Sequence, residues 1–162
     1  MLWISGINVM QGYYGEPEKT AEVLKDGWYC TGDLVYLDQE NFIFIAGRLS
    51  RFAKLGGEMV PQEGIEDALN KILGNPPDAE PRVAVTSIPD EKKGERIIVL
   101  HTGLNLKPSE INTKFLELGY PALWIPNVDA YYQVESIPLL GTGKPDLYAI
   151  HETALKLTSA EA

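Results

Sequence analysis

Hydrophobic and polar residues alternate over short stretches in the first fifty positions, a pattern with the two-residue period of β-strands. The expected strands span residues 2–9, 33–37 and 42–46. The polar run 38–41 separates the last two, which predicts a hairpin. A short helix is expected over 17–24, because a proline stands in its first turn, where the missing N–H costs nothing.

From about residue 50 the spacing of apolar residues changes, and helices alternate with strands. Ile65, Leu69, Ile72 and Leu73 follow the i, i+4, i+7, i+8 spacing of one helix face. The expected helices span residues 61–73, 108–118 and 145–157, and the expected strands after residue 60 span 82–88, 96–101 and 128–137. The order β, α, β, β, α, β, α predicts an α+β unit with a small three-stranded sheet and helices, preceded by a β-rich region.

Charge and composition narrow the possible partners. The chain has 14 Lys and Arg residues against 23 Asp and Glu residues, a net charge of -9. This balance argues against a nucleic-acid partner, because neutralising phosphates requires clustered basic residues. The single cysteine, Cys30, excludes an internal disulfide and fits a reducing compartment. No apolar run is long enough for a membrane span, and the two histidines form no metal signature. We therefore expect a cytoplasmic protein without a metal site.

The hairpin over 33–46 carries the first candidate for chemistry. Asp33 begins a strand, where its carboxylate could accept two hydrogen bonds from the vicinal hydroxyls of a ribose. A hairpin centred between positions 39 and 40 pairs position 33 with position 46, and places Arg48 further along the same edge. The pair would form either one edge of a nucleoside site or a surface salt bridge. On these residues alone the salt bridge is favoured, because short motifs of this kind are common by chance.

Two lysines near glycines are further candidates. Gly56 and Gly57, close to Lys54, permit the approach of another backbone or a narrow ligand, although on these residues alone a bulge or tight turn is favoured. Lys144 ends a glycine-containing loop before a helix. This loop is no phosphate-binding loop, because Pro145 stands where that motif requires Ser or Thr. The alternative for Lys144 is an ordinary solvated side chain.

Four segments, taken in order, resemble the adenylate-forming superfamily, which includes acyl-CoA synthetases, amino-acid adenylation domains and luciferase-like enzymes. They are GINVMQGY at 6–13, GWYCTGD at 27–33, GRLSRFAKLGG at 47–57 and PLLGTGK at 138–144. They are similar to the family patterns G-x-x-V-x-x-G-Y, G-W-[FY]-x-T-G-D, G-R-x-x-x-x-x-K-x-x-G and P-x-x-x-x-G-K. Within the superfamily, RFAK, GEMV and PLLGTGKPD most resemble acyl-[acyl-carrier-protein] synthetases fused to lysophospholipid acyltransferases.

The resemblance implies roles for the residues that bind nucleotide and carry out adenylation. Asp33 would hold the ribose hydroxyls of ATP, and Arg48 would assist on the ribose and phosphate side. Lys144 would reach the substrate carboxylate and the α-phosphate as the acyl-AMP bond forms. ATP and Mg²⁺ are the implied cofactors, and the magnesium ligand would lie upstream of this chain.

The resemblance also implies a second half-reaction. Rotation about Ser50 would withdraw the adenylation lysine and bring the face formed by Lys54, Gly56 and Gly57 to the acyl-adenylate, which opens a path for a pantetheine thiol. The sequence departs from the family here, since Ser50 stands where Asp or Lys is usual and Met59 stands where Arg is common. These departures affect the thioester-forming step.

The implied organisation is a piece of a larger ligase. Residues 1–49 would be the C-terminal tail of the large adenylation domain, and residues 50–162 the C-terminal lid domain. Its partners would be its own upstream adenylation domain, a fatty acid, and acyl carrier protein or CoA. The piece alone would be inactive, and a fused acyltransferase could attach the parent protein to a membrane. Two alternatives are a binding module that docks on a separate adenylation core or carrier protein, and an unrelated structural domain.

Overall fold

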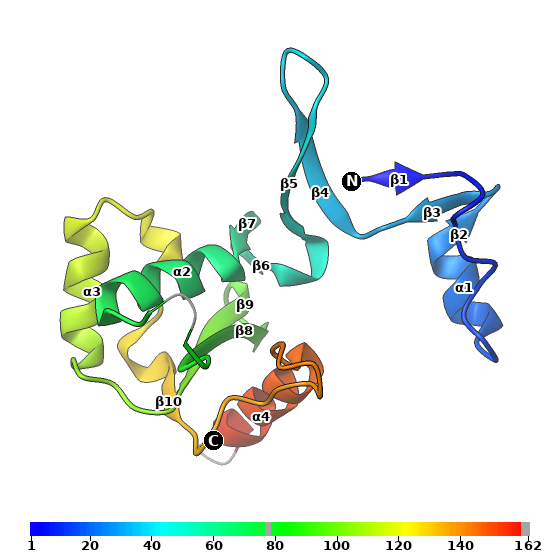
Figure 1. Cartoon of the computed structure of the whole chain (residues 1–162). Coiled ribbons are helices and arrows are strands. Elements are labelled where there is room, and N and C mark those ends of the chain that lie inside the picture. Colours follow the sequence, from blue (N-terminus) through cyan, green and yellow to red (C-terminus); the bar gives the residue numbers. More distant parts are fainter. Residues whose placement is uncertain (77–78, 160–162) are drawn as a thin grey trace. The chain divides into compact units, whose positions relative to one another are not determined.

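The chain divides into two compact units, Met1–Ser50 and Arg51–Ala162. The computed structural model describes residues 1–76 and 79–159. No helix in these two ranges is long and apolar enough to cross a membrane. The boundary predicted from the sequence lies between residues 49 and 50, one residue before the division between the two units (Figure 1).

The first unit consists of two small sheets and one helix. A three-stranded sheet has the order β1-β3-β2, and a separate two-stranded sheet pairs β4 with β5. The elements are β1 (Trp3–Ile4), α1 (Pro17–Val23), β2 (Leu24–Lys25), β3 (Trp28–Cys30), β4 (Asp33–Leu37) and β5 (Ile43–Arg48). The prediction of a strand over 2–9 is therefore wrong beyond Ile4. Gly6 has a φ of +151° and its carbonyl accepts a hydrogen bond from the Val9 N–H at 3.1 Å, which turns the chain out of the sheet.

The β4–β5 hairpin forms as predicted, but its register differs. Position 33 pairs with position 48 and not with 46, and Leu37 pairs with Ile43. The turn is one residue longer than assumed, because the Asp38 carboxylate accepts backbone N–H groups on both sides of Asn41, which has a φ of +66°. A β-bulge between Leu34 and Val35 shifts the pairing by a further residue.

The second unit has a five-stranded mixed sheet, in the order β10-β9-β6-β7 with β8 paired to β9. Its elements are β6 (Phe52–Leu55), β7 (Glu58–Pro61), α2 (Gln62–Leu73), β8 (Val83–Asp90), β9 (Gly94–His101), α3 (Pro108–Glu117), β10 (Tyr131–Gln133) and α4 (Leu147–Ser159). The α+β class is confirmed, whereas the expected three-stranded sheet is corrected to five strands. The β6–β7 hairpin was missed because its strands are only four residues long. The strand predicted over 128–137 is shorter, since a 3-10 turn occupies Val128–Ala130.

Both faces of this sheet are buried, which explains the near-continuous apolar sequence of its central strands. Alternate residues of β8 and β9 point to opposite sides. Val83, Val85, Ile97 and Val99 pack in the cluster with α2 and α3. Ala84, Ile88, Ile98 and Leu100 pack in the cluster with α4. Figure 1 shows α2 and α3 on one side of the sheet and α4 on the other.

Helix α2 contains a glycine that makes room for a tryptophan. A Cβ atom added to Gly64 would lie 2.7 Å from two ring atoms of Trp124. The ring has little freedom to move, because it stacks on Tyr120, which contacts Phe115 in the buried cluster. Gly64 thus fixes the segment around Trp124 against the helix.

Gly64→Ala is expected to destabilise the second unit by about 1 kcal/mol. In an ordinary helix interior the change would stabilise by about 1 kcal/mol, but overpacking costs about 1–3 kcal/mol, and the Cβ meets the Trp124 ring. Urea unfolding followed at the Trp124 indole resonance measures the difference. In a Trp124→Leu background, with unfolding followed at the Phe115 ring resonances instead, the same change should become neutral or stabilising. Stabilisation in the wild-type background would contradict the packing argument.

Candidate functional site

Asp33 and Arg48 form a close charged pair in the first unit. The two residues are direct partners across β4 and β5. The Arg48 Nε donates a hydrogen bond to Asp33 Oδ1 at 3.0 Å. The side chain of Asp33 is 19% exposed and that of Arg48 is 60% exposed, so both side chains are accessible to solvent. The bulge and the longer turn together create this contact, which the predicted register would not have given.

The backbone around Asp33 is held by hydrogen bonds from three directions. The Asp33 N–H donates to Thr31 Oγ1 at 3.1 Å, and the same hydroxyl donates to the Leu2 carbonyl at 3.2 Å. The Leu49 N–H donates to the Gly32 carbonyl at 2.8 Å. The carboxylate therefore stands on a preorganised segment.

The charge state of this site follows from the pair. The hydrogen bond from Arg48, assisted by Thr31, holds the pKa of Asp33 below its usual range. The pKa of the neighbouring Tyr29 is raised, mainly by a side-chain hydrogen bond with Tyr13. The site thus presents a carboxylate and a guanidinium beside the side chains of Tyr13 and Tyr29. Such a set suits the hydroxyl and phosphate groups of a nucleotide.

An open groove of about 650 Å³ adjoins this pair. Its volume lies within the usual range for small-molecule sites. Residues of the first unit line it, among them Tyr13, Tyr29, Thr31, Gly32 and Arg48. Arg48 and the two tyrosines line the groove together, so a ligand in it could contact Arg48.

Arg48→Gln is expected to raise the pKa of Asp33 toward its ordinary value of 3.8. The change removes the hydrogen bond from Arg48, which is the main cause of the lowered pKa, while the weaker hydrogen bond from Thr31 remains. Because the folded-state pKa is lowered, the pair stabilises the fold above the ordinary pKa, and this stabilisation is lost as pH falls through the folded-state value. An NMR titration of the Asp33 carboxyl in both proteins measures the effect. An unchanged pKa would show that Arg48 does not set the charge state.

Lys144 lies in the second unit, at the end of a tight loop before α4. The Leu140 N–H donates to the Lys144 carbonyl and the Gly143 N–H to the Leu140 carbonyl, both at 2.8 Å. Gly143 has a φ of +80°, and Leu139 bridges Pro145 across the loop. The backbone of the loop is thus closed on itself, and the exposed lysine side chain projects from a defined base. The predicted helix start at Pro145 is corrected to Leu147, since the proline belongs to the bridge.

Lys54, Gly56 and Gly57 lie in the β6–β7 hairpin. Gly56 and Gly57 have φ values of +59° and +96°, which favour glycine, and nothing lies within 4 Å of the Cβ that either would carry. The Gly56 N–H donates to the Lys93 carbonyl at 2.8 Å, and the Lys54 N–H donates to Glu95 Oε2 at 2.9 Å. The β6–β7 turn therefore has free space on its outer side, and it is hydrogen-bonded to the turn between β8 and β9.

Ser50 is the last residue of the first unit and lies exposed in the 3-10 turn Leu49–Arg51. The structure thus brings Asp33 together with Arg48, and Lys54 together with Gly56 and Gly57. Among the described residues, no ion pair involves Lys144.

Sequence reasoning missed a buried charge network at the start of the second unit. Arg51 is 6% exposed and forms ion pairs with Glu66 and Glu63 of α2. Its guanidinium also donates to the Val85 carbonyl at 3.0 Å and to Gln62 Oε1 at 3.3 Å. One feature of the sequence could have indicated this network. Gln62 and Glu66 are polar residues that lie four residues apart on the α2 face that carries the apolar residues.

No group of three or more His, Cys, Asp or Glu side chains in the described ranges could hold a metal ion.

The comparisons with known proteins agree with the motifs. No protein-family model matches the chain. It is 37% identical over 145 residues to the long-chain-fatty-acid–CoA ligase of Thermus thermophilus, a match that covers 88% of this chain and 25% of the ligase. It is 35% identical over 144 residues to the ligase of the same name from Bacillus subtilis, covering 87% of this chain and 24% of that protein.

A solved structure agrees in fold. The amide bond synthetase McbA from Marinactinospora thermotolerans superposes with a TM-score of 0.68 at 27% identity, covering 93% of this chain and 30% of that one. The chain thus spans about a quarter of the length of the curated relatives it matches. The chain is accordingly homologous to one segment of the acyl-CoA ligases, which belong to the adenylate-forming superfamily.

Proposed function

We propose that this chain is the C-terminal part of an ATP-dependent, AMP-forming fatty acid ligase. In this proposal residues 1–49 form the end of the large adenylation domain, and residues 50–162 form its lid. The observation that carries the proposal is the match to two long-chain-fatty-acid–CoA ligases over nearly nine-tenths of the chain. The whole enzyme would activate a fatty acid and pass it to a thiol.

In the first half-reaction a carboxylate oxygen of the fatty acid attacks the α-phosphorus of ATP, and pyrophosphate leaves. The Asp33 carboxylate accepts hydrogen bonds from the ribose hydroxyls. Arg48 orients the Asp33 carboxylate and faces the phosphate side of the nucleotide. Lys144 offsets the negative charge that builds up between the carboxylate and the α-phosphate. Its place at the end of a closed loop supports this role, because a fixed base limits the entropy lost on binding. Mg²⁺ would accompany ATP on ligands outside this chain.

In the second half-reaction a thiolate attacks the acyl carbonyl, and AMP leaves. Rotation at Ser50 withdraws Lys144 and presents the open turn of Gly56 and Gly57, with Lys54 beside it, to the acyl-adenylate. The bare outer side of this turn supports the assignment, because a pantetheine arm needs a narrow passage without side chains. One lid that serves both steps is gating by domain motion.

CoA is the first candidate acceptor, because both relatives are named as CoA ligases. Acyl carrier protein is the second candidate. It is supported by the motifs RFAK, GEMV and PLLGTGKPD, which resemble acyl-[acyl-carrier-protein] synthetases. Both acceptors present the same phosphopantetheine thiol.

The test is a chimera in which this chain replaces the matching quarter of the Thermus thermophilus ligase. The chimera should form acyl-AMP from ATP and a long-chain fatty acid, whereas the truncated Thermus protein without any C-terminal quarter should not. The control is the same truncation rejoined to its own C-terminal quarter. A chimera that is folded and binds ATP but forms no acyl-AMP would contradict the proposal. Activity with the chain added as a separate polypeptide would favour a stand-alone binding module.

A further inference from the structure

The backbone that joins the two units is held by each of them up to a definite residue. On the first-unit side, the Leu49 N–H donates to the Gly32 carbonyl at 2.8 Å. On the second-unit side, strand pairing begins with Phe52, at the start of the β6–β7 hairpin. The residues between lie in the 3-10 turn Leu49–Arg51, a conformation whose hydrogen bonds have poorer geometry than those of an α-helix. By backbone pairing alone, Ser50 and Arg51 would therefore both belong to the junction.

The side chain of Arg51 fixes this residue in the second unit. It is 6% exposed and forms ion pairs with Glu63 and Glu66 of α2. Its guanidinium also donates to the Val85 carbonyl of β8 at 3.0 Å. A side chain bonded to two different elements of one unit moves with that unit. This leaves the exposed Ser50 as the junction.

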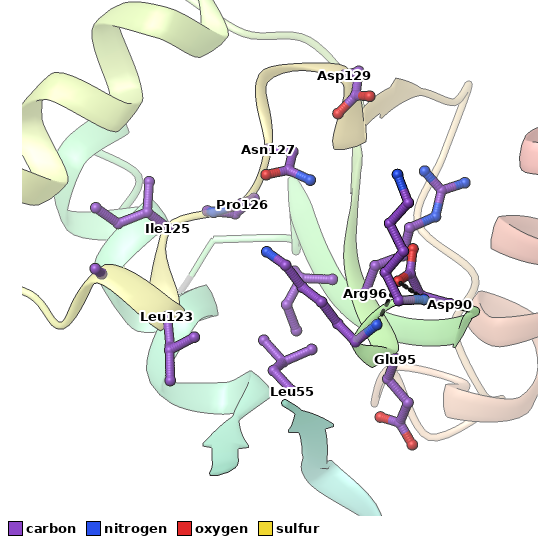
Figure 2. Close-up of a pocket in the computed structure, with 13 residues that line it drawn as sticks. Leu55, Asp90, Glu95, Arg96, Leu123, Ile125, Pro126, Asn127 and Asp129 are labelled. Carbon is purple, nitrogen blue, oxygen red and sulfur yellow. Dashed lines mark hydrogen bonds between the residues drawn. The ribbon is translucent and has the colours of Figure 1, made fainter. Parts of the chain in front are cut away.

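The strand that follows Arg51 is fixed in the second unit by several contacts. Ala53 and Leu55 belong to the buried cluster with α2 and α3, and the Lys54 N–H donates to Glu95 Oε2 at 2.9 Å. Figure 2 shows Leu55 together with residues of the turn between β8 and β9 and of the segment 122–129, with which it lines a pocket of about 370 Å³. The second unit therefore holds its own chain continuously from Arg51 onward.

The chemistry of the Arg51 anchor indicates that it fixes direction as well as position. A buried ion pair contributes little net stability compared with apolar side chains of similar volume. Ala53 and Leu55 show that apolar anchors occur in the neighbouring strand. A guanidinium, in contrast, donates along fixed directions in its plane. Its partner is also oriented, because Glu66 Oε1 accepts the Val85 N–H at 2.7 Å. The network therefore defines the direction in which the chain enters the second unit.

We propose that Arg51 is a positioning residue for the rotation of the lid: its buried bonds to Glu66 and Val85 confine the pivot to Ser50, so that the lid turns as one body about a single residue. The inference rests on the proposed function, since it requires a lid that takes two orientations. A pivot of one residue leaves the lid few other orientations. Little freedom is then lost when the lid docks for either half-reaction.

The first test lengthens the pivot and leaves the network intact. One glycine inserted between Ser50 and Arg51 of the chimera should lower both acyl-AMP formation and thioester formation about tenfold, because the backbone freedom of one residue corresponds to about that factor. The urea midpoint of the second unit should stay unchanged, since the bonds of Arg51 remain. Rates within about twofold of those of the chimera without the insertion would overturn the single-residue pivot.

The second test weakens the network and keeps the length of the junction. Glu66→Gln removes the charge that pairs with Arg51 and should lower both half-reactions about fivefold at a temperature where the protein is fully folded. The matched control is Asp67→Asn, which removes an exposed α2 carboxylate that is in no ion pair of the described residues. It should leave both rates unchanged.

Backbone motion in the 162-residue chain gives a readout that does not depend on activity. The amide NMR order parameter of Arg51 should fall in Glu66→Gln and stay unchanged in Asp67→Asn. A network with a merely structural role would lower the urea midpoint in Glu66→Gln, but would leave the rates of the folded protein and this order parameter unchanged. That result would overturn the role of Arg51.

The proposed function and the pivot fail in different ways. A folded chimera that forms no acyl-AMP contradicts the proposed function, whereas the order parameter of Arg51 is measured without it. An active chimera that tolerates the inserted glycine overturns the pivot and leaves the proposed function standing.

Discussion

Lys144→Ala in the chimera is expected to lower the rate of acyl-AMP formation about a hundredfold or more. A donor aimed at charge that develops in the transition state contributes about a factor of 10²–10³, and the proposal gives that place to the Lys144 ammonium. Folding should be unaffected, because the lysine side chain is exposed and only its backbone closes the loop. Release of pyrophosphate, measured under saturating ATP and fatty acid, reports the adenylation step.

The matched control is Lys114→Ala, which removes an exposed lysine of α3. It should leave the rate within about twofold. Thioester formation from added acyl-AMP is the second readout, and it should survive in Lys144→Ala, because the lysine is withdrawn in that step. Equal adenylation by Lys144→Ala and the unchanged chimera would show that the loop does not carry the chemistry, even if the family assignment stands.

Arg51→Met is expected to destabilise the second unit by about 3 kcal/mol or more at pH 8. Removing one partner of a buried ion pair costs about 3–5 kcal/mol, because the other charge stays buried without compensation. Here that charge is on Glu66, whose side chain is 20% exposed and which also accepts the Val85 N–H at 2.7 Å. Urea unfolding followed at the Trp124 indole resonance isolates this unit from the first.

The cost should depend on pH, with a sign set by Glu66. Burial raises its pKa and the Arg51 charge opposes that rise, so removing the arginine raises the pKa further. A raised carboxyl pKa means that the folded state binds the proton more tightly, so stability falls as pH rises above the ordinary pKa of 4.5. The loss in Arg51→Met should therefore be smaller at pH 5 than at pH 8. A loss that is larger at pH 5 would contradict the buried-charge explanation.

Glu66→Gln serves as the paired variant. It keeps an oxygen to accept the Val85 N–H but carries no charge. In the Arg51→Met background it should recover part of the lost stability at pH 8, whereas alone it should destabilise. Additive losses in the double variant would show that the two residues do not act as a pair.

The sequence determined the elements whose signals are local. The expected helix over 61–73 was found at Gln62–Leu73, because four apolar residues with helical spacing end at a glycine that adopts a φ of +71°. The central strands were found within two residues of their expected bounds at all four ends, because both of their faces are apolar. The four ordered motifs pointed to the family that the comparisons then supported. The roles of Asp33, Arg48, Ser50, Lys54, Gly56, Gly57 and Lys144 remain predictions.

Only the tertiary structure decided which residues meet. The contact between Asp33 and Arg48 depends on a bulge and a side-chain-bonded turn, and each shifts the strand register by one residue without a clear sign in the alternation. The Arg51 network and the fit of Trp124 into Gly64 join residues far apart in sequence, so no local pattern contains them. Helices and strands are specified by residues close together in the sequence, whereas sites are formed where helices and strands pack against one another.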